Sequence, residues 1–191
     1  MCICDKRNPE RITGLKKVFI LEKIKPMQII PLLQKELEQE SAVTRKFLQI
    51  VPADKLAWKP HEKSMTLMQL TTHLAELPGW ISMALHTSEL DFSAQPYEQT
   101  TVQNSDELLQ IFEKALESGK AALAAASEDD LWPEWTLRNG EQVYMKLSKY
   151  EVIRHALAQT IHHRAQLGVF LRLLNVPIPG TYGPSADDPG F

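Results

Sequence analysis

Three of the six histidines of this chain lie in one short segment, at positions 155, 162 and 163. Imidazole nitrogens bind divalent metal ions and exchange protons near neutral pH, so such a cluster is typical of a metal or acid–base site. Residues four apart in an α-helix lie one above the other, and Gln159 and His163 have this spacing. We therefore expect one helix to offer an amide oxygen and an imidazole to the same ion.

His163 is expected to face the protein core more directly than its neighbour His162. Its direction on a helical projection is shared by three apolar residues, Ala156, Leu167 and Phe170. His162 instead shares its direction with Glu151, which favours a solvent-facing position. His155 lies on the same helical side as Gln159, and the sequence leaves open whether it supports the site or faces solvent.

His73 is a second histidine on or beside the apolar face of a predicted helix. An imidazole without a partner in the core costs about 1–3 kcal/mol, and either a metal or a hydrogen bond removes that cost. His73, Gln159 and His163 together predict an incomplete coordination sphere that leaves positions for water or substrate. Glu76, three residues after His73, either reaches this site or caps a nearby polar group.

The elements that must position these side chains are four segments with apolar residues at helical spacing. The first segment spans 27–51 and is stopped by Pro52, and residues 52–64 connect it to the next with one short turn of helix. The second begins at an N-cap, Thr66, and runs to Leu85 with a kink, not a break, at Pro78 and Gly79.

The third predicted helix is capped by Asn104 or Ser105 and ends near 129–130, after a loop over 91–103. The fourth runs over 148–175. Between them, Asn139-Gly140 separates two alternating runs within 135–145 and predicts a small hairpin. The tail, 176–191, is too rich in proline and glycine for a helix, and is either disordered or a lid that folds back.

These elements predict an all-α fold, an antiparallel four-helix bundle with a small hairpin and an irregular tail. The length of 191 residues suits a single domain, which we assign to 27–191, with 1–26 as an N-terminal extension. Cys2 and Cys4 are too close in sequence to pair without strain. We therefore expect no structural disulfide.

The composition argues against several kinds of partner. The net charge is −3 and the Lys and Arg residues are scattered, so the basic stripe of a nucleic-acid-binding protein is missing. No apolar run reaches the length of a membrane span, and the N-terminal segment lacks the pattern of a signal peptide. The sequence therefore predicts a cytoplasmic protein that binds neither nucleic acid nor membrane.

Two motifs of the sequence are the run from His155 to Leu167, HALAQTIHHRAQL, and the segment from Leu70 to Glu76, LTTHLAE. The first is similar to the signature of the last helix in the DinB/YfiT-like superfamily, and the second resembles the motif that supplies that family's first histidine. The order and separation of the two motifs match together. The resemblance spans the chain from Met27 to its C-terminus.

This resemblance implies a four-helix bundle holding a divalent metal, commonly zinc or nickel, through three histidines. His73 matches the first ligand and His163 the third, whereas Gln159 stands where the family usually has its second histidine. A Gln oxygen is a weaker and harder ligand than imidazole, so metal affinity should fall or metal preference should change. Members of the superfamily include transferases that activate a low-molecular-weight thiol, and hydrolases.

The sequence leaves two functions open. The first is a metal-dependent thiol S-transferase or hydrolase acting on an unknown small molecule, with Trp80 and Tyr182 as candidates to line its pocket. The alternative is a non-catalytic, stress-related bundle with a degenerate or empty metal site. Both are compatible with a homodimer, since helical bundles often associate through two-fold interfaces.

Overall fold

The computed structural model describes residues 28–94 and 98–189 and contains five α-helices and a three-stranded sheet within them. The predicted N-terminal extension, 1–26, and both cysteines lie outside the described residues. The helices are α1 (Ile30–Gln49), α2 (Leu67–Glu76), α3 (Gly79–His86), α4 (Ser105–Ala125) and α5 (Lys149–Leu173). The strands are β1 (Glu89–Asp91), β2 (Glu134–Asn139) and β3 (Gln142–Ser148).

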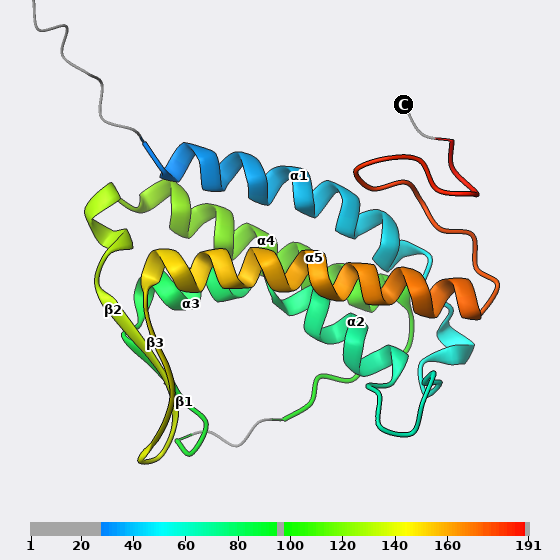
Figure 1. Ribbon diagram of the computed structural model, residues 1–191, viewed down its shortest axis with the longest axis horizontal. Coiled ribbons are helices and arrows are strands. Elements are labelled where there is room, and N and C mark those ends of the chain that lie inside the picture. The colour runs from blue at the N-terminus through cyan, green and yellow to red at the C-terminus, as the bar shows by residue number, and fades with distance from the viewer. Residues whose placement is uncertain (1–27, 95–97, 190–191) are drawn as a thin grey trace, which may run out of the picture.

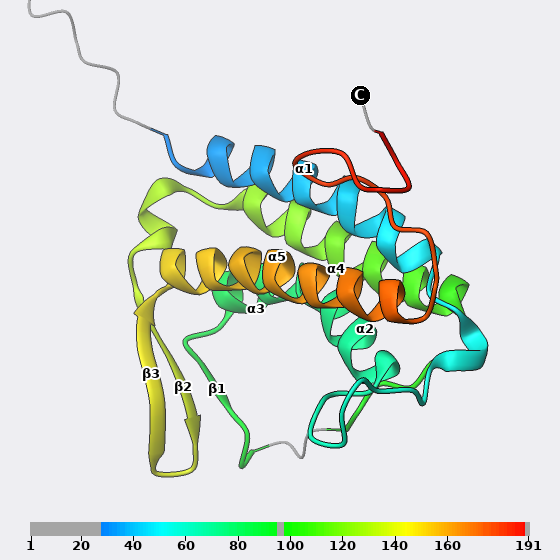
Figure 2. The same cartoon turned by 45° about the vertical axis from the view of Figure 1, so that its right-hand side comes forward.

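The helices pack lengthwise around a shared core (Figure 1). α1 and α5 run in the same direction, while α2, α3 and α4 run in the opposite one, so the connection between α3 and α4 crosses the length of the bundle (Figures 1 and 2). The bundle is thus antiparallel between α1 and α4 but parallel between α1 and α5. The prediction of an antiparallel four-helix bundle is therefore only partly right.

Two helices, α2 and α3, stand where the sequence predicted one kinked helix. α2 begins with a capping box, in which the Thr66 hydroxyl accepts from the Gln69 backbone N–H and the Gln69 side chain accepts from the Thr66 N–H. It ends at Glu76, and α3 begins at Gly79. The prediction of a kink was wrong because Pro78 has no N–H to donate and its ring excludes the carbonyl four residues earlier, which here ends the helix.

The break at Pro78 also sets how closely α3 and α4 approach. The Pro78 carbonyl oxygen lies where a side chain at Gly119 of α4 would begin, 2.5 Å from the position of a Cβ atom. Only glycine fits at this contact. Asn104 caps α4 as predicted, but α4 ends at Ala125, earlier than the predicted 129–130, and a separate short turn follows at Glu128–Leu131.

The predicted hairpin is present, but the all-α assignment was too narrow. β2 and β3 pair antiparallel around Gly140, whose φ of 58° is a conformation that glycine adopts readily. β1 lies just before and at the start of the predicted loop, 91–103, and pairs in parallel with β2. The fold is therefore mostly helical with a small sheet attached. The sequence did not predict β1 because its pairing with β2 joins segments that are distant in sequence.

The last helix carries the predicted chemistry and starts and ends close to the expected residues. Ser148 and Glu151 form a capping box at its beginning. Asn175, at φ 59°, ends it in a left-handed conformation. The tail then folds back over α1 and α5, as one of the two predicted alternatives had it (Figure 2).

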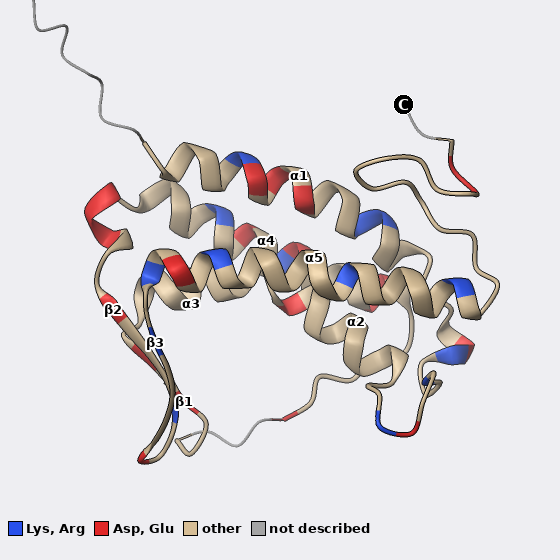
Figure 3. Ribbon diagram, in the orientation of Figure 1, with Lys and Arg blue, Asp and Glu red and all other residues tan. Residues whose placement is uncertain are grey.

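Residues of both charges are mixed along α1 and α5 (Figure 3). Ion pairs join α1 to its neighbours: Arg45–Glu113 and Lys120–Glu38 to α4, and Arg154–Glu36 to α5. Exposed pairs of this kind contribute about 0–1 kcal/mol each, so the apolar core carries most of the stability. Among the described residues, no helix combines the length and apolar character that a membrane crossing needs.

Candidate metal centre

The structure brings together the two histidines that the sequence singled out from different helices. The rings of His73, on α2, and His163, on α5, meet edge to face with their centroids 4.8 Å apart. Both side chains are half-buried. Their capping boxes fix where α2 and α5 begin, and the packing of α2 against α5 then sets the distance between the imidazoles.

The histidine pair opens into a pocket of about 320 Å³, the histidine pocket, lined by Met65, Gln69, His73, Gln99 and His163. The amides of Gln69 and Gln99 are joined by a hydrogen bond of 3.3 Å. Since Gln69 also closes the capping box of α2, its amide is held in place from two sides. The pocket thus combines two imidazoles with two carboxamides and one flexible apolar side chain.

Both imidazoles are kept neutral by their surroundings. Burial lowers the pKa of His73 below its ordinary value of 6.5, and the neighbouring His163 lowers it further. Burial also lowers the pKa of His163, against the raising effect of the hydrogen bond that its ring donates to Gln166. At neutral pH both rings therefore keep a lone pair, as metal binding requires.

The hydrogen bond to Gln166 also fixes which nitrogen of His163 is free. The Nδ1 atom lies 2.9 Å from Oε1 of Gln166. Because a carbonyl oxygen only accepts, Nδ1 carries the proton, and Nε2 keeps its lone pair. A hydrogen bond of this kind is the usual way in which a protein orients a metal-binding histidine.

Gln159, the third predicted ligand, is half-buried and has a different partner. Its Nε2 lies 3.4 Å from Nε2 of His155, four residues earlier on α5. His155 therefore contacts Gln159, and Gln159 is not among the residues that line the histidine pocket. The structure brings His73 and His163 together and places Gln159 one helical turn away on α5.

The neutral imidazoles of His73 and His163, from two helices, are suitable as two ligands of a divalent metal. The remaining coordination positions would be taken by amide oxygens, water or substrate. Within 28–94 and 98–189, no group of three or more His, Cys, Asp or Glu side chains is arranged to hold an ion. Among these described residues, a third protein ligand would therefore have to be another kind of group, such as an amide oxygen.

The other candidate residues lie apart from the pair or beside it. His61 and His86 are exposed, as expected, and His162 is exposed while its ring contacts His163 at 4.9 Å. Glu76 accepts a hydrogen bond from the Thr100 hydroxyl, so it pairs with a nearby polar group. Trp80 does not line the histidine pocket.

Sequence reasoning missed the most buried charged residue near the site, Arg164. Its side chain is 2% exposed and pairs with Glu40 of α1, with 2.6 Å between Nη2 and Oε2. Tyr182, in the tail, donates to the same carboxylate at 2.8 Å. The signal was present, because Arg164 lies seven residues from both Leu157 and Leu171 and therefore shares their buried face.

Comparison with known proteins supports the family that the motifs suggested. The model of the DinB family matches residues 25–189. The chain belongs to the DinB family. No curated protein matches the chain.

Solved structures of DinB-like proteins share this fold. One from Bacillus subtilis is 18% identical with a TM-score of 0.61, covering 78% of this chain and 97% of its own. Another, from Bacillus cereus, is 16% identical with a TM-score of 0.61, covering 78% and 95%. A mycothiol-dependent maleylpyruvate isomerase is 14% identical with a TM-score of 0.53, covering 73% of this chain and 60% of its own. At these identities the likeness concerns the DinB fold alone.

Proposed function

We propose that this DinB-family protein is a divalent-metal-dependent enzyme, a thiol S-transferase or a hydrolase, with its centre in the histidine pocket. The observation that carries the proposal is the contact of His73 with His163 at 4.8 Å, in a pocket open to small molecules. Zinc and nickel both suit imidazole ligands. A protein of the same fold is a mycothiol-dependent maleylpyruvate isomerase, and this is the reason for proposing a thiol as a reactant.

In this proposal, His73 and His163 hold the metal, and Gln166 orients His163 by accepting its Nδ1 proton. Gln159 would supply the third ligand, in place of its contact with His155. A bound divalent ion would stabilise a thiolate or lower the pKa of water toward neutrality. The amides of Gln69 and Gln99 then bind polar groups of the substrate within the same pocket.

Metal content tests the proposal directly. The protein, prepared without a metal-binding tag, is loaded with zinc or nickel, freed of excess metal and measured by plasma mass spectrometry. We expect near-stoichiometric metal in the parent and its loss in His163→Ala. His86→Ala is the matched control, because its imidazole is exposed on α3 and bonds to Ser82, away from the pocket.

A parent that takes up no metal even after loading would overturn the enzyme proposal. That result would favour the alternative, a non-catalytic, stress-related bundle whose metal site has degenerated. The contact between Gln159 and His155, and the missing third charged or imidazole ligand among the described residues, favour this second candidate. Equal metal loss in His86→Ala and His163→Ala would point to adventitious surface binding.

We also propose that the protein is a cytoplasmic homodimer. β3 is an edge strand of the sheet and carries two exposed apolar side chains, Val143 and Tyr144. Pairing of β3 with its copy would satisfy the unpaired backbone groups of that edge. Light scattering after size exclusion is expected to give twice the chain mass of 21.7 kDa for the parent, and the mass of a single chain for Val143→Pro.

A further inference from the structure

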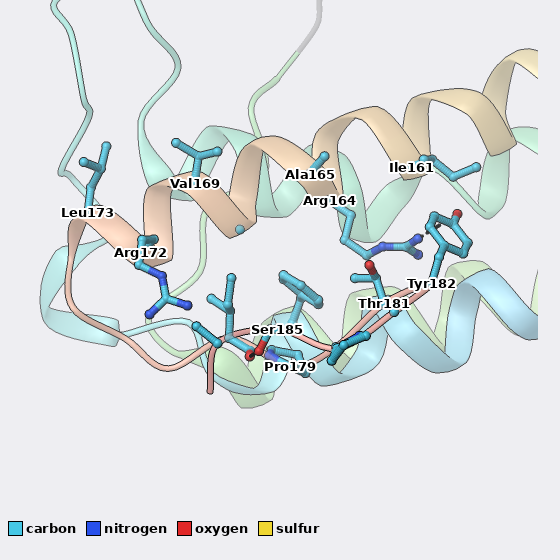
Figure 4. Close-up of a pocket in the computed structure, with 17 residues that line it drawn as sticks. Ile161, Arg164, Ala165, Val169, Arg172, Leu173, Pro179, Thr181, Tyr182 and Ser185 are labelled. Atoms are coloured by element: carbon cyan, nitrogen blue, oxygen red, sulfur yellow. Dashed lines mark hydrogen bonds between the residues drawn. The ribbon is translucent and has the colours of Figure 1, made fainter. Parts of the chain in front are cut away.

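A second and larger pocket lies on the opposite side of α5 from the histidine pair. It has a volume of about 570 Å³ and is enclosed by α5, by Phe47 of α1 and by residues 178–186 of the tail (Figure 4). This volume falls within the range of small-molecule sites, about 300–1,000 Å³. The tail pocket, as we call it, shares no lining residue with the histidine pocket.

The walls of the tail pocket are mainly apolar and partly uncovered. Ala165, Val169 and Leu173 are spaced four apart on α5 and form one stripe along it. Val169 is 60% exposed and Leu173 is 57% exposed. Large apolar side chains grouped around a concavity are a feature of binding sites, because their burial by a ligand is favourable.

One buried cation contributes an unused hydrogen-bond donor to this pocket. Arg164 donates through Nη1 to Glu40 and Thr44, and through Nη2 to Glu40 and Tyr182. Its Nε–H has no such partner among the described residues. No buried side-chain nitrogen or oxygen among the described residues lacks a hydrogen-bond partner, so this Nε–H is not fully covered, and the tail pocket is the open space that Arg164 lines.

The tail that closes the pocket is held at several points, so the pocket exists before any ligand arrives. Tyr182 donates to Glu40, and its ring lies 5.5 Å from the Arg164 guanidinium. Arg172 pairs with Asp187, and the Ser185 hydroxyl donates to the Ile178 carbonyl at 2.6 Å. A pre-formed wall lowers the ordering cost of binding.

We propose that the tail pocket binds a small, largely apolar molecule that carries one carbonyl-type hydrogen-bond acceptor. The apolar body packs on the α5 stripe and on Ile178, and the acceptor receives the free Nε–H of Arg164. A neutral acceptor suits the site because Glu40 already balances the charge of Arg164. The site is independent of the proposed metal centre.

The probes for the test are 1-indanone and indane, which differ only in that a carbonyl group of the first replaces a methylene group of the second. The full-length protein, with labelled Ile, Leu and Val methyl groups, is titrated with each probe by NMR. We expect 1-indanone to shift the methyl signals of Val169, Leu173 and Ile178, and to leave those of the core residues Leu74 and Val152 in place. Indane should bind roughly threefold to tenfold more weakly, because it cannot accept the Arg164 hydrogen bond.

Two substitutions fill the pocket from exposed positions, Ala165→Trp and Val169→Trp, and should abolish binding of 1-indanone. Ala158→Trp is the matched control, since Ala158 is exposed on the same helix two turns earlier and lies outside the pocket. Circular dichroism checks that each variant is folded. Binding that survives in both pocket variants would overturn the proposal.

Two further results would also overturn it. If indane binds as tightly as 1-indanone, Arg164 supplies no hydrogen bond and the stated ligand class is wrong. If the Val169 and Leu173 signals move with protein concentration in the absence of probe, a second copy of the chain covers the stripe instead.

Discussion

The polar groups on the two sides of α5 differ in their charge and in their hydrogen bonding. Toward α2, His73 and His163 are half-buried and neutral, and their contact leaves ring nitrogens available. Toward α1, Arg164 is buried with its charge, and Glu40, Thr44 and Tyr182 take up its Nη donors. His163 and Arg164 are adjacent on α5. His163 belongs to a site whose ring nitrogens remain available, whereas Arg164 belongs to a structural network in which almost every donor is hydrogen-bonded.

This difference follows from the cost of burial. A buried charge must be paired and hydrogen-bonded, whereas a neutral imidazole at a pocket wall tolerates incomplete bonding. The Arg164 side should therefore determine stability and the position of the tail. The His163 side should determine what the protein binds.

The largest expected effect is on the Arg164 side. Arg164→Met leaves the Glu40 carboxylate buried without its cation, and should lower the free energy of unfolding by about 3–5 kcal/mol. Arg154→Met is the control on the same helix, because its pair with Glu36 is partly exposed and should contribute about 0–1 kcal/mol. Urea denaturation measures both. Equal losses in the two variants would remove the contrast between the sides of α5.

Restoring the family histidine should sharpen the metal-binding side. Gln159→His adds an imidazole one turn before His163, and we expect affinity for zinc to rise on the order of tenfold or more. Ala158→His, at the adjacent exposed position, should leave affinity unchanged. Competition with a chromophoric chelator measures both. Unchanged zinc affinity in Gln159→His would mean that position 159 cannot reach the ion.

The attachment of the tail should weaken at high pH. Burial of the hydroxyl and its hydrogen bond to Glu40 raise the pKa of Tyr182 above 10.0. The stability that this group contributes is therefore complete below pH 10.0 and is lost as pH rises through the higher folded pKa. The effect should be small, since the side chain is largely exposed, and the 295 nm titration of the parent minus that of Tyr182→Phe isolates it.

The smallest expected effect concerns the protonation of His73 in the metal-free protein. Because its pKa lies below 6.5 in the folded chain, its contribution to stability is present above pH 6.5 and declines as pH falls toward the folded value. In His163→Ala the second cause of the shift disappears. The pKa of His73, followed by NMR of the ring protons, should then move upward, and a downward move would contradict the assigned causes.

How much the sequence revealed depended on the range of the interactions. Thr66, Asn104 and Asn139-Gly140 act on their immediate neighbours, and each starts a helix or forms a turn as predicted. The inward direction of His163 relative to His162 likewise follows from helical periodicity within one segment. Such features require no knowledge of the partner helix.

The features that the sequence could not provide join distant residues. β1 pairs with β2 although α4 lies between them in the sequence, and Tyr182 donates a hydrogen bond to Glu40, 142 residues away in the chain. Gln159 contacts His155 and does not line the histidine pocket. This contact depends on which side-chain rotamers the packed bundle leaves room for.

The sequence by itself therefore determined the helices, their caps, the hairpin and the two histidines that face inward. Only the tertiary structure decided the third strand, the burial of Arg164 and the fold-back of the tail that makes the second pocket. The physical reason is that caps and periodicity are properties of a few consecutive residues. Burial and pairing are settled only when segments far apart in the chain compete for the same neighbours.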